Sequence, residues 1–432
     1  MAKKRKRKKF RLKERNVTKE DEKNLYRKYK KAFKKNLGQE ELTNTICFLF
    51  LDLIYIYFDN KRRKLYKLFF PVIMANFMEL GSINSVIKEY KTKKKLYSES
   101  YTCRILRQMD KNDSLEISRI FRKILFKILK QKGFKNKGFC VAIDITTKPF
   151  YGDKKLHMVK GGKRKAGTNF AIHYLTASIV EEEVRFNLLC FPLSSTTLVD
   201  RKVKQMINEI EKIISIKLFY LDRGFASRGY SRIIKSMGYK FIMPITKNDK
   251  LKDLKFQIKK QSEILGISDD EYTLSEIEYV FYEDKPKEYQ ENVKLLVLYE
   301  KKNNKKEEEV LFFITNIEEF SSEDYYQLIE SYRYRFGIET NYRVDNIFSA
   351  LTSSIIASIR YLLMQISLTA QDLWTLFNFM IKDEKHRQPR EKFKGNYSVL
   401  SIIKARIRKM DFIWRPAITA VQFKRKMERV LG

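Results

Sequence analysis

Residues 139–147, FCVAIDITT, decide the fold of this chain. The run from Phe139 to Ile143 is mostly apolar, and the sequence turns polar directly after the acid Asp144. A short apolar run with β-branched residues, bounded by Gly138 and a Thr-Thr-Lys-Pro turn, predicts a buried strand with Asp144 at its carboxyl end. Ligands of open α/β sheets bind beyond the carboxyl ends of the strands, so Asp144 is a candidate site residue.

A second stretch of the chain has the same design. Residues 217–225, KLFYLDRGF, place Asp222 at the end of another apolar run. A helix predicted at 199–214 precedes this strand and supplies the crossover that a parallel neighbour requires. Parallel neighbours lie about 4.8 Å apart. We therefore expect Asp144 and Asp222 to reach the same hard divalent cation through their carboxylate oxygens.

The order of the predicted elements indicates an α/β core. In sequence order they are three strands (139–143, 171–180 and 184–191), the helix at 199–214, the Asp222 strand, a helix (227–237) and a strand (240–245). Three further strands, at 272–282, 293–299 and 310–314, fall in an acidic segment with 18 acids and 12 bases between 249 and 319. We predict a mixed five-stranded sheet flanked by helices, with an antiparallel β-rich insertion.

The predicted domains follow from these patterns. Residues 1–38 are expected to form a basic disordered arm and 39–135 a helical, DNA-binding domain. The core would take 136–248 and 321–381, the insertion 249–320, and a basic carboxyl-terminal region 382–432. The last of these would contact DNA or form a dimer. Within the helical domain, two short helices between Ile83 and Met109 suit a helix-turn-helix, although such pairs also occur in ordinary helical bundles.

Composition narrows the class of protein. The chain has 89 Lys and Arg against 52 Asp and Glu, a net charge of +37. This charge favours a nucleic-acid partner, while a ribosomal or membrane-surface protein stays open on charge alone. The most apolar run, 45–58, contains Asp52 and falls short of the ~20 residues of a membrane span. We expect a cytoplasmic, nucleoid-associated protein with no membrane partner.

The residues that usually bind zinc lack ligand spacing in this sequence. The four cysteines form no CxxC pair and stand in apolar surroundings, which predicts reduced core residues of an intracellular protein. The three histidines are scattered. Any metal site must therefore be built from carboxylates, which suit Mg²⁺ and Mn²⁺.

A basic, glycine-rich loop is predicted at 148–167. It holds seven basic residues and four glycines. Glycines let the backbone approach a phosphate chain closely while the cations neutralise it. The alternative is a plain hairpin connector.

The third candidate acid stands in a helix predicted at 324–348, with start signals at 321–323. Its face carries residues at intervals of three and four, namely Tyr332, Arg335, Glu339, Tyr342 or Arg343, and Asn346. A face that mixes aromatic, cationic and acidic groups suits a charged ligand, with Glu339 toward metal and Arg335 and Arg343 toward phosphate. The alternative is a solvated face on which Glu339 pairs with Arg335 and Arg343.

At these residues the chain resembles the DDE transposases of the insertion-sequence family with a Tyr-x2-Arg-x3-Glu-x6-Lys signature. Tyr332, Arg335 and Glu339 match the first three positions, whereas Asn346 stands where lysine is expected. Arg343 would partly supply the missing charge.

The resemblance extends over about 138–374. AIDITTKPFYGD carries Asp144 as the first acid, and YLDRGF carries Asp222 as the second. It implies a ribonuclease-H-like core in which Asp144, Asp222 and Glu339 are the catalytic residues and the ligands of two Mg²⁺ or Mn²⁺ ions. The implied DNA contacts are Tyr332, Arg335, Arg343, Asn346, Arg223, Lys163, Arg164 and Lys165.

The function implied by the resemblance is that of a DNA transposase. Such an enzyme cleaves strands at the inverted-repeat ends of a transposon and transfers them into target DNA, as a homodimer in a synaptic complex. Two alternatives stay open. One is a ribonuclease-H-like nuclease that stops at hydrolysis, and the other is a non-catalytic basic nucleic-acid-binding protein.

Overall fold

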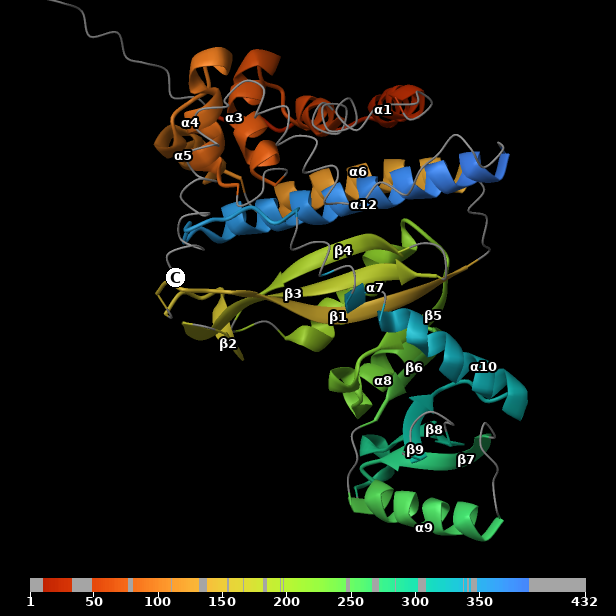
Figure 1. Cartoon of the computed structure of the whole chain (residues 1–432). Helices are drawn as coiled ribbons and strands as arrows, with labels where there is room; N and C mark the ends of the chain where they lie inside the picture. The colour runs from red at the N-terminus through yellow and green to blue at the C-terminus, as the bar shows by residue number, and fades with distance from the viewer. Residues whose placement is uncertain are drawn as a thin grey trace, which may run out of the picture. The chain divides into compact units, whose positions relative to one another are not determined.

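A computed structural model gives the fold of the chain (Figure 1). The described residues are 11–32, 49–76, 81–109, 111–131, 138–153, 155–165, 167–181, 185–194, 196, 198–245, 249–265, 272–283, 285–301, 308–336, 338, 339, 342 and 348–387. The chain divides into two compact units, one formed by residues 1–135 and 341–432 and the other by residues 136–340.

The first unit is helical. Its described helices are α1 (Lys19–Ala32), α3 (Arg62–Ala75), α4 (Ile83–Lys94), α5 (Glu99–Leu106), α6 (Lys111–Gln131) and α12 (Ala357–Arg387). α6 and α12 lie side by side (Figure 1). A fully buried ion pair joins them, with Arg122 Nε 3.2 Å from Asp372 Oδ2. Ser82 caps α4 in a reciprocal hydrogen-bond pair with Ser85.

The amino-terminal segment differs from the predicted disordered arm. Lys19–Ala32 forms α1, and its Leu25, Tyr26 and Tyr29 are buried. Three apolar side chains on one helix face supply enough burial to order a charged segment, which charge counting alone does not reveal. The basic carboxyl-terminal region predicted at 382–432 lies outside the described residues beyond Arg387.

The second unit is built on a nine-stranded mixed sheet within the described residues. The strands are β1 (Phe139–Pro149), β2 (Val159–Lys165), β3 (Thr168–Val180), β4 (Arg185–Leu193), β5 (Ile216–Leu221), β6 (Phe241–Pro244), β7 (Tyr272–Phe281), β8 (Glu291–Lys301) and β9 (Glu308–Thr315). Their order is β2-β3-β1-β5-β6-β9-β8-β7, and β4 also pairs with β3. The helices are α7 (Val199–Glu211), α8 (Arg228–Ser236), α9 (Asp249–Leu265) and α10 (Ser322–Tyr332).

The predicted order of strands and helices appears in the chain as β1, β3, β4, α7, β5, α8 and β6, with β2 as an additional strand between β1 and β3. β1 pairs antiparallel with β3, and β3 pairs antiparallel with β4. The chain then crosses through α7 and returns as β5, parallel to β1, before α8 leads to the parallel strand β6. β1 begins with five buried residues because it has a hydrogen-bonded neighbour on each side, which places its apolar run in the core.

Two features of the sheet differ from the prediction. The predicted sheet has five strands, whereas the strands of the insertion extend it, because β9 pairs antiparallel with β6 and continues the core sheet into β8 and β7. The segment 148–167 is not a loop throughout, because β1 extends to Pro149 and Val159–Lys165 forms β2. β2 adds to the part of β3 between Thr168 and Ile172.

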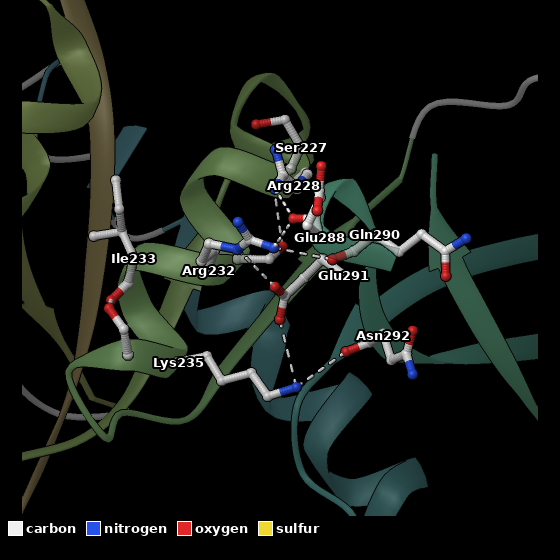
Figure 2. Close-up of polar contacts among 11 residues, drawn as sticks. Ser227, Arg228, Arg232, Ile233, Lys235, Glu288, Gln290, Glu291 and Asn292 are labelled. Atoms are coloured by element: carbon white, nitrogen blue, oxygen red, sulfur yellow. Dashed lines mark hydrogen bonds and ion pairs between the residues drawn. The ribbon is translucent and has the colours of Figure 1, made fainter. Parts of the chain in front are cut away.

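Side chains of α8 fasten the insertion to the core (Figure 2). Arg228 and Arg232 both donate to the carbonyl of Glu288, at 2.7 and 3.1 Å. Arg232 Nε and Lys235 Nζ lie 3.1 and 3.4 Å from the carboxylate of Glu291, whose side chain is only 10% exposed. Glu291 is therefore a nearly buried acid with two cationic partners.

The structure also bears on two predictions about the class of protein. Cys140 and Cys190 are buried free thiols and Cys103 is a half-buried one, in accord with reduced cysteines. Within the residues that the structure describes, we find no helix with the length and apolar character that crossing a bilayer requires.

We predict that Glu291→Ala lowers the free energy of unfolding by about 2 kcal/mol, since hydrogen bonds to charged groups are lost and two cations keep no acidic partner there. Urea denaturation followed by circular dichroism measures the change. Glu319→Ala, which removes an exposed carboxylate from the same unit, is the control and should change little. Equal midpoints for the two variants would contradict the proposed fastening.

Candidate active site

The first acid, Asp144, lies on β1 just beyond the point where the neighbouring strand β5 ends. Asp144 was predicted at the end of its strand, but β1 continues to Pro149 because β3 pairs with it as far as that residue. On its other side, β1 pairs with β5 only as far as Ile143 opposite Leu221. Asp144 is thus the first residue of β1 beyond the end of β5.

The second acid, Asp222, follows β5 directly, as predicted. Because β1 and β5 are parallel and Ile143 faces Leu221, Asp144 and Asp222 are the next residues on two adjacent strands. Such strands lie about 4.8 Å apart. Each carboxylate accepts a hydrogen bond of 2.7 Å from the N–H of the following residue, Ile145 or Arg223.

The third acid is carried by the segment that follows α10. Ser321 and Asp324 form a capping box that begins α10, in accord with the predicted start. The helix does not run unbroken as predicted, because a 3-10 turn, η3 (Arg333–Arg335), follows Tyr332. Residues 338 and 339 are helical again, which brings Glu339 into the site.

Two tyrosine hydroxyls fix α10 to the strand that carries Asp222. Tyr220 of β5 donates to Ser331 Oγ at 2.8 Å. Tyr332 donates to the carbonyl of Leu221, also at 2.8 Å. The segment with Arg335 and Glu339 is therefore anchored beside the residue that precedes Asp222.

Arg335 joins the acids. Its Nη2 lies 2.9 Å from Glu339 Oε1 and 3.7 Å from Asp222 Oδ1. The Arg335 side chain is 5% exposed, whereas those of Asp222 and Glu339 are about half exposed. The pairing of Glu339 with Arg335 was the alternative interpretation of this helix face, but that alternative required a solvated face. Arg335 is buried and reaches an acid on another element, so this face of the helix is not a solvated face.

The charges of the three acids influence one another. Burial raises the pKa of Asp144 to about 6, and the nearby Asp222 and Glu339 carboxylates also raise it. The N–H of Ile145 and the Arg335 guanidinium act in the opposite direction. Residues from β1, the end of β5 and the segment after α10 therefore form one electrostatic cluster.

The donor atoms of this cluster suit a hard divalent cation, because all three side chains offer carboxylate oxygens. In the described residues, however, no group of three or more His, Cys, Asp or Glu side chains is arranged as a metal site. The Arg335 guanidinium instead lies against two of the carboxylates. The ligand atoms of the cluster therefore suit a divalent metal ion. In the structure, the positive charge beside Asp222 and Glu339 is that of Arg335.

The predicted DNA contacts differ in their exposure in the structure. Tyr332 is buried and hydrogen-bonded to β5, so it supports the site rather than presenting a surface to DNA. Arg223 is exposed next to Asp222, and Lys163 and Arg164 are exposed on β2. The side chain of Lys165, and both Arg343 and Asn346, lie outside the described residues.

Sequence reasoning missed the tyrosine anchors of α10. Tyr220 and Ser331 are 111 residues apart, as are Leu221 and Tyr332. No local pattern connects them. The link between Arg335 and Glu339 was detectable from their spacing of four residues, whereas the reach of Arg335 to Asp222 was not.

We predict a pH-dependent stability for the chelator-treated protein. The pKa of Asp144 rises from an ordinary 3.8 to about 6 on folding. Ionisation of Asp144 therefore costs folding free energy above pH 6, and this cost fades as the pH falls toward 4. Asp144→Asn should raise the free energy of unfolding by up to about 3 kcal/mol more at pH 7.5 than at pH 4. Urea midpoints at both pH values measure this, and a pH-independent difference would contradict it.

Comparison with known proteins gives two similarities. Residues 195–354 match the family model of a transposase DDE domain. A solved structure of the piggyBac transposase, in a synaptic complex with hairpin DNA, shares 11% sequence identity at a TM-score of 0.44, covering 80% of this chain and 70% of that one. No curated protein matches the sequence. The matched segment contains Asp222 and Glu339 but not Asp144.

Proposed function

We propose that this protein is a DNA transposase in which Asp144, Asp222 and Glu339 form the catalytic centre. One observation carries the proposal: the segment that matches a transposase DDE domain contains Asp222 and Glu339, and Arg335 contacts both of these acids. The register of β1 against β5 sets Asp144 beside Asp222. The path β4-β3-β1-β5-β6 agrees with the ribonuclease-H-like core that the resemblance implies.

The three carboxylates would hold Mg²⁺ or Mn²⁺. Such ions activate the attacking oxygen and stabilise the leaving oxygen in phosphoryl transfer. The chain supplies the geometry: parallel pairing sets Asp144 beside Asp222, and the Tyr332 hydroxyl anchors the segment that carries Glu339. The partial exposure of Asp222 and Glu339 leaves these two acids accessible to a substrate.

Arg335 would hold a phosphate of the substrate. Its Nε and Nη1 are buried and find no hydrogen-bond partner among the described residues. Buried N–H groups of a guanidinium strongly favour an acceptor, and a phosphate oxygen offers one with the matching charge. The site would thus take up an anion beside the acids.

The substrate would be DNA, in accord with the net charge of +37. By the resemblance, cleavage would take place at inverted-repeat ends, strand transfer would follow into target DNA, and two copies would act in a synaptic complex. The experiment that tests this function uses duplexes from the sequence that flanks the gene, with Mg²⁺ or Mn²⁺. Cleaved ends that join a target plasmid support transposition, cleavage without joining indicates a nuclease, and binding without cleavage indicates a non-catalytic protein.

We predict that Asp144→Ala, Asp222→Ala and Glu339→Ala each reduce cleavage about a thousandfold or more, because each loses several kcal/mol of metal-mediated stabilisation. DNA affinity should change little. Single-turnover cleavage and filter binding measure the two quantities. Asp153→Ala, which removes an exposed acid from the segment between β1 and β2, is the control. Full cleavage by any of the first three variants would remove that residue from the site.

We predict that Arg335→Gln weakens binding of the end duplex and lowers the salt slope of log K by about 1, as expected for one lost phosphate contact. Arg333→Gln is the matched control, because Arg333 is the exposed neighbour that pairs with Glu330. Binding isotherms at four salt concentrations give both slopes. If Arg335→Gln keeps the wild-type slope, Arg335 has a structural role only.

A further inference from the structure

A glycine of β2 stands out because the packing of the sheet does not require it. At Gly162, an added Cβ would approach the Cβ of Ala171 to 2.9 Å, so close packing against β3 explains that glycine. At Gly161, an added Cβ would meet no atom within 4 Å. The Gly161 peptide is held in place, with His173 Nε2 2.9 Å from its carbonyl oxygen. A glycine in a strand marks a bulge, a bend or the close approach of a ligand or another backbone, and the register of β2 is irregular between Gly161 and Lys165.

The open side of Gly161 is the face of the sheet that carries Asp144. Residues directly opposite each other in antiparallel strands share a face, and every second residue of a strand returns to it. Asp144 faces Thr176 of β3, and Phe170 lies six residues earlier on the same face. Phe170 faces Gly161 of β2. The free space beside Gly161 and the acid cluster therefore lie on one surface.

The strand also carries unneutralised charge. Lys163 and Arg164 follow Gly161 where the register of β2 shifts, and both side chains are exposed. Neither forms an ion pair or hydrogen bond with another described residue. β2 is an outer strand of the sheet, so its far edge has no strand partner in the described chain. Lysine on an edge strand also discourages pairing with other proteins, but this role does not explain the exposed glycine.

We propose that β2 is a second DNA-binding surface, which holds the phosphate backbone of duplex DNA that extends from the catalytic centre. This inference rests on the proposed function and adds the path of the substrate. Gly161 would admit the backbone closely, while Lys163 and Arg164 neutralise its phosphates. Six residues along a strand span about 20 Å, and DNA rises about 3.4 Å per base pair. Because Lys163 and Arg164 lie beyond Gly161 along β2, the contacted phosphates lie at least about six base pairs from the scissile bond.

The test compares two isosteric substitutions at Gly161 in the full-length protein. The open space accommodates either side chain. Gly161→Asp places a carboxylate among the phosphates, whereas Gly161→Asn adds nearly the same volume without charge. We expect Gly161→Asp to bind the end duplex at least about tenfold more weakly than Gly161→Asn at 0.15 M salt. Equal affinities of the two variants would overturn the proposal.

A second pair of variants tests the cations. Lys163→Gln with Arg164→Gln should lower the salt slope of log K by about 2, one for each lost phosphate contact. Lys204→Gln with Lys217→Gln removes the same charge from exposed positions of the same unit and should leave the slope nearly unchanged. Equal slope changes in the two double variants would mean that the slope depends on net charge alone, and would overturn the proposal.

Duplex length gives the position of the contact. Duplexes that are cut back to three base pairs on one side of the cleavage point should lose all dependence on Lys163 and Arg164, whereas cutting back the other side should not. Dependence that survives truncation on both sides would place the surface elsewhere. If the wild type binds the long duplex with this dependence but never cleaves it, the proposed function fails while the β2 surface stands.

Discussion

The parallel pairing of β1 with β5 is the constraint on which the candidate site depends. It sets Ile143 opposite Leu221, and this single register makes Asp144 and Asp222 neighbours although the chain runs through three more strands and a helix between them. A shift of one residue would turn one acid to the opposite face of the sheet. The apolar residues before each acid resist that shift, because they are buried in the core.

The third acid depends on a different kind of constraint. Glu339 stands on a segment that is fixed by side chains rather than by a strand ladder, through the hydroxyls of Tyr220 and Tyr332. Arg335 then completes the cluster by balancing part of its negative charge. The carboxylates of Asp222 and Glu339 are about half exposed, so the site is open toward solvent. The guanidinium of Arg335 is almost fully buried and holds these carboxylates in place from the protein side.

Much of this arrangement could be predicted from local sequence. The apolar runs before Asp144 and Asp222 locate β1 and β5, and Ser321 marks the start of α10, because these signals lie within a few residues of what they determine. The ion pair of Arg335 with Asp222 could not be predicted, since it joins residues 113 positions apart through a fold not yet known. For the same reason the sequence did not show that the insertion strands continue the core sheet.

The strand β2 shows a different limit of sequence reasoning. Its residues, VKGGKRK, have neither apolar alternation nor β-branched content beyond Val159, so local preference indicates a loop. The strand exists because β3 is long enough to leave part of its edge for another partner. Tertiary context thus outweighs local preference. The helix α1 is a similar case, since a few buried side chains order a segment whose average charge suggests otherwise.

The order of strands also separates basic and acidic residues toward opposite ends of the sheet. At one end stands β2 with its lysines and arginine, and at the other stands β7, in an insertion with six more acids than bases and with Glu276 and Glu278 on the strand itself. In the field of a polyanion, such a separation of charge produces a torque. The second unit would therefore be oriented before it contacts the polyanion, with β2 toward the polyanion and the insertion away from it. Such orientation speeds association.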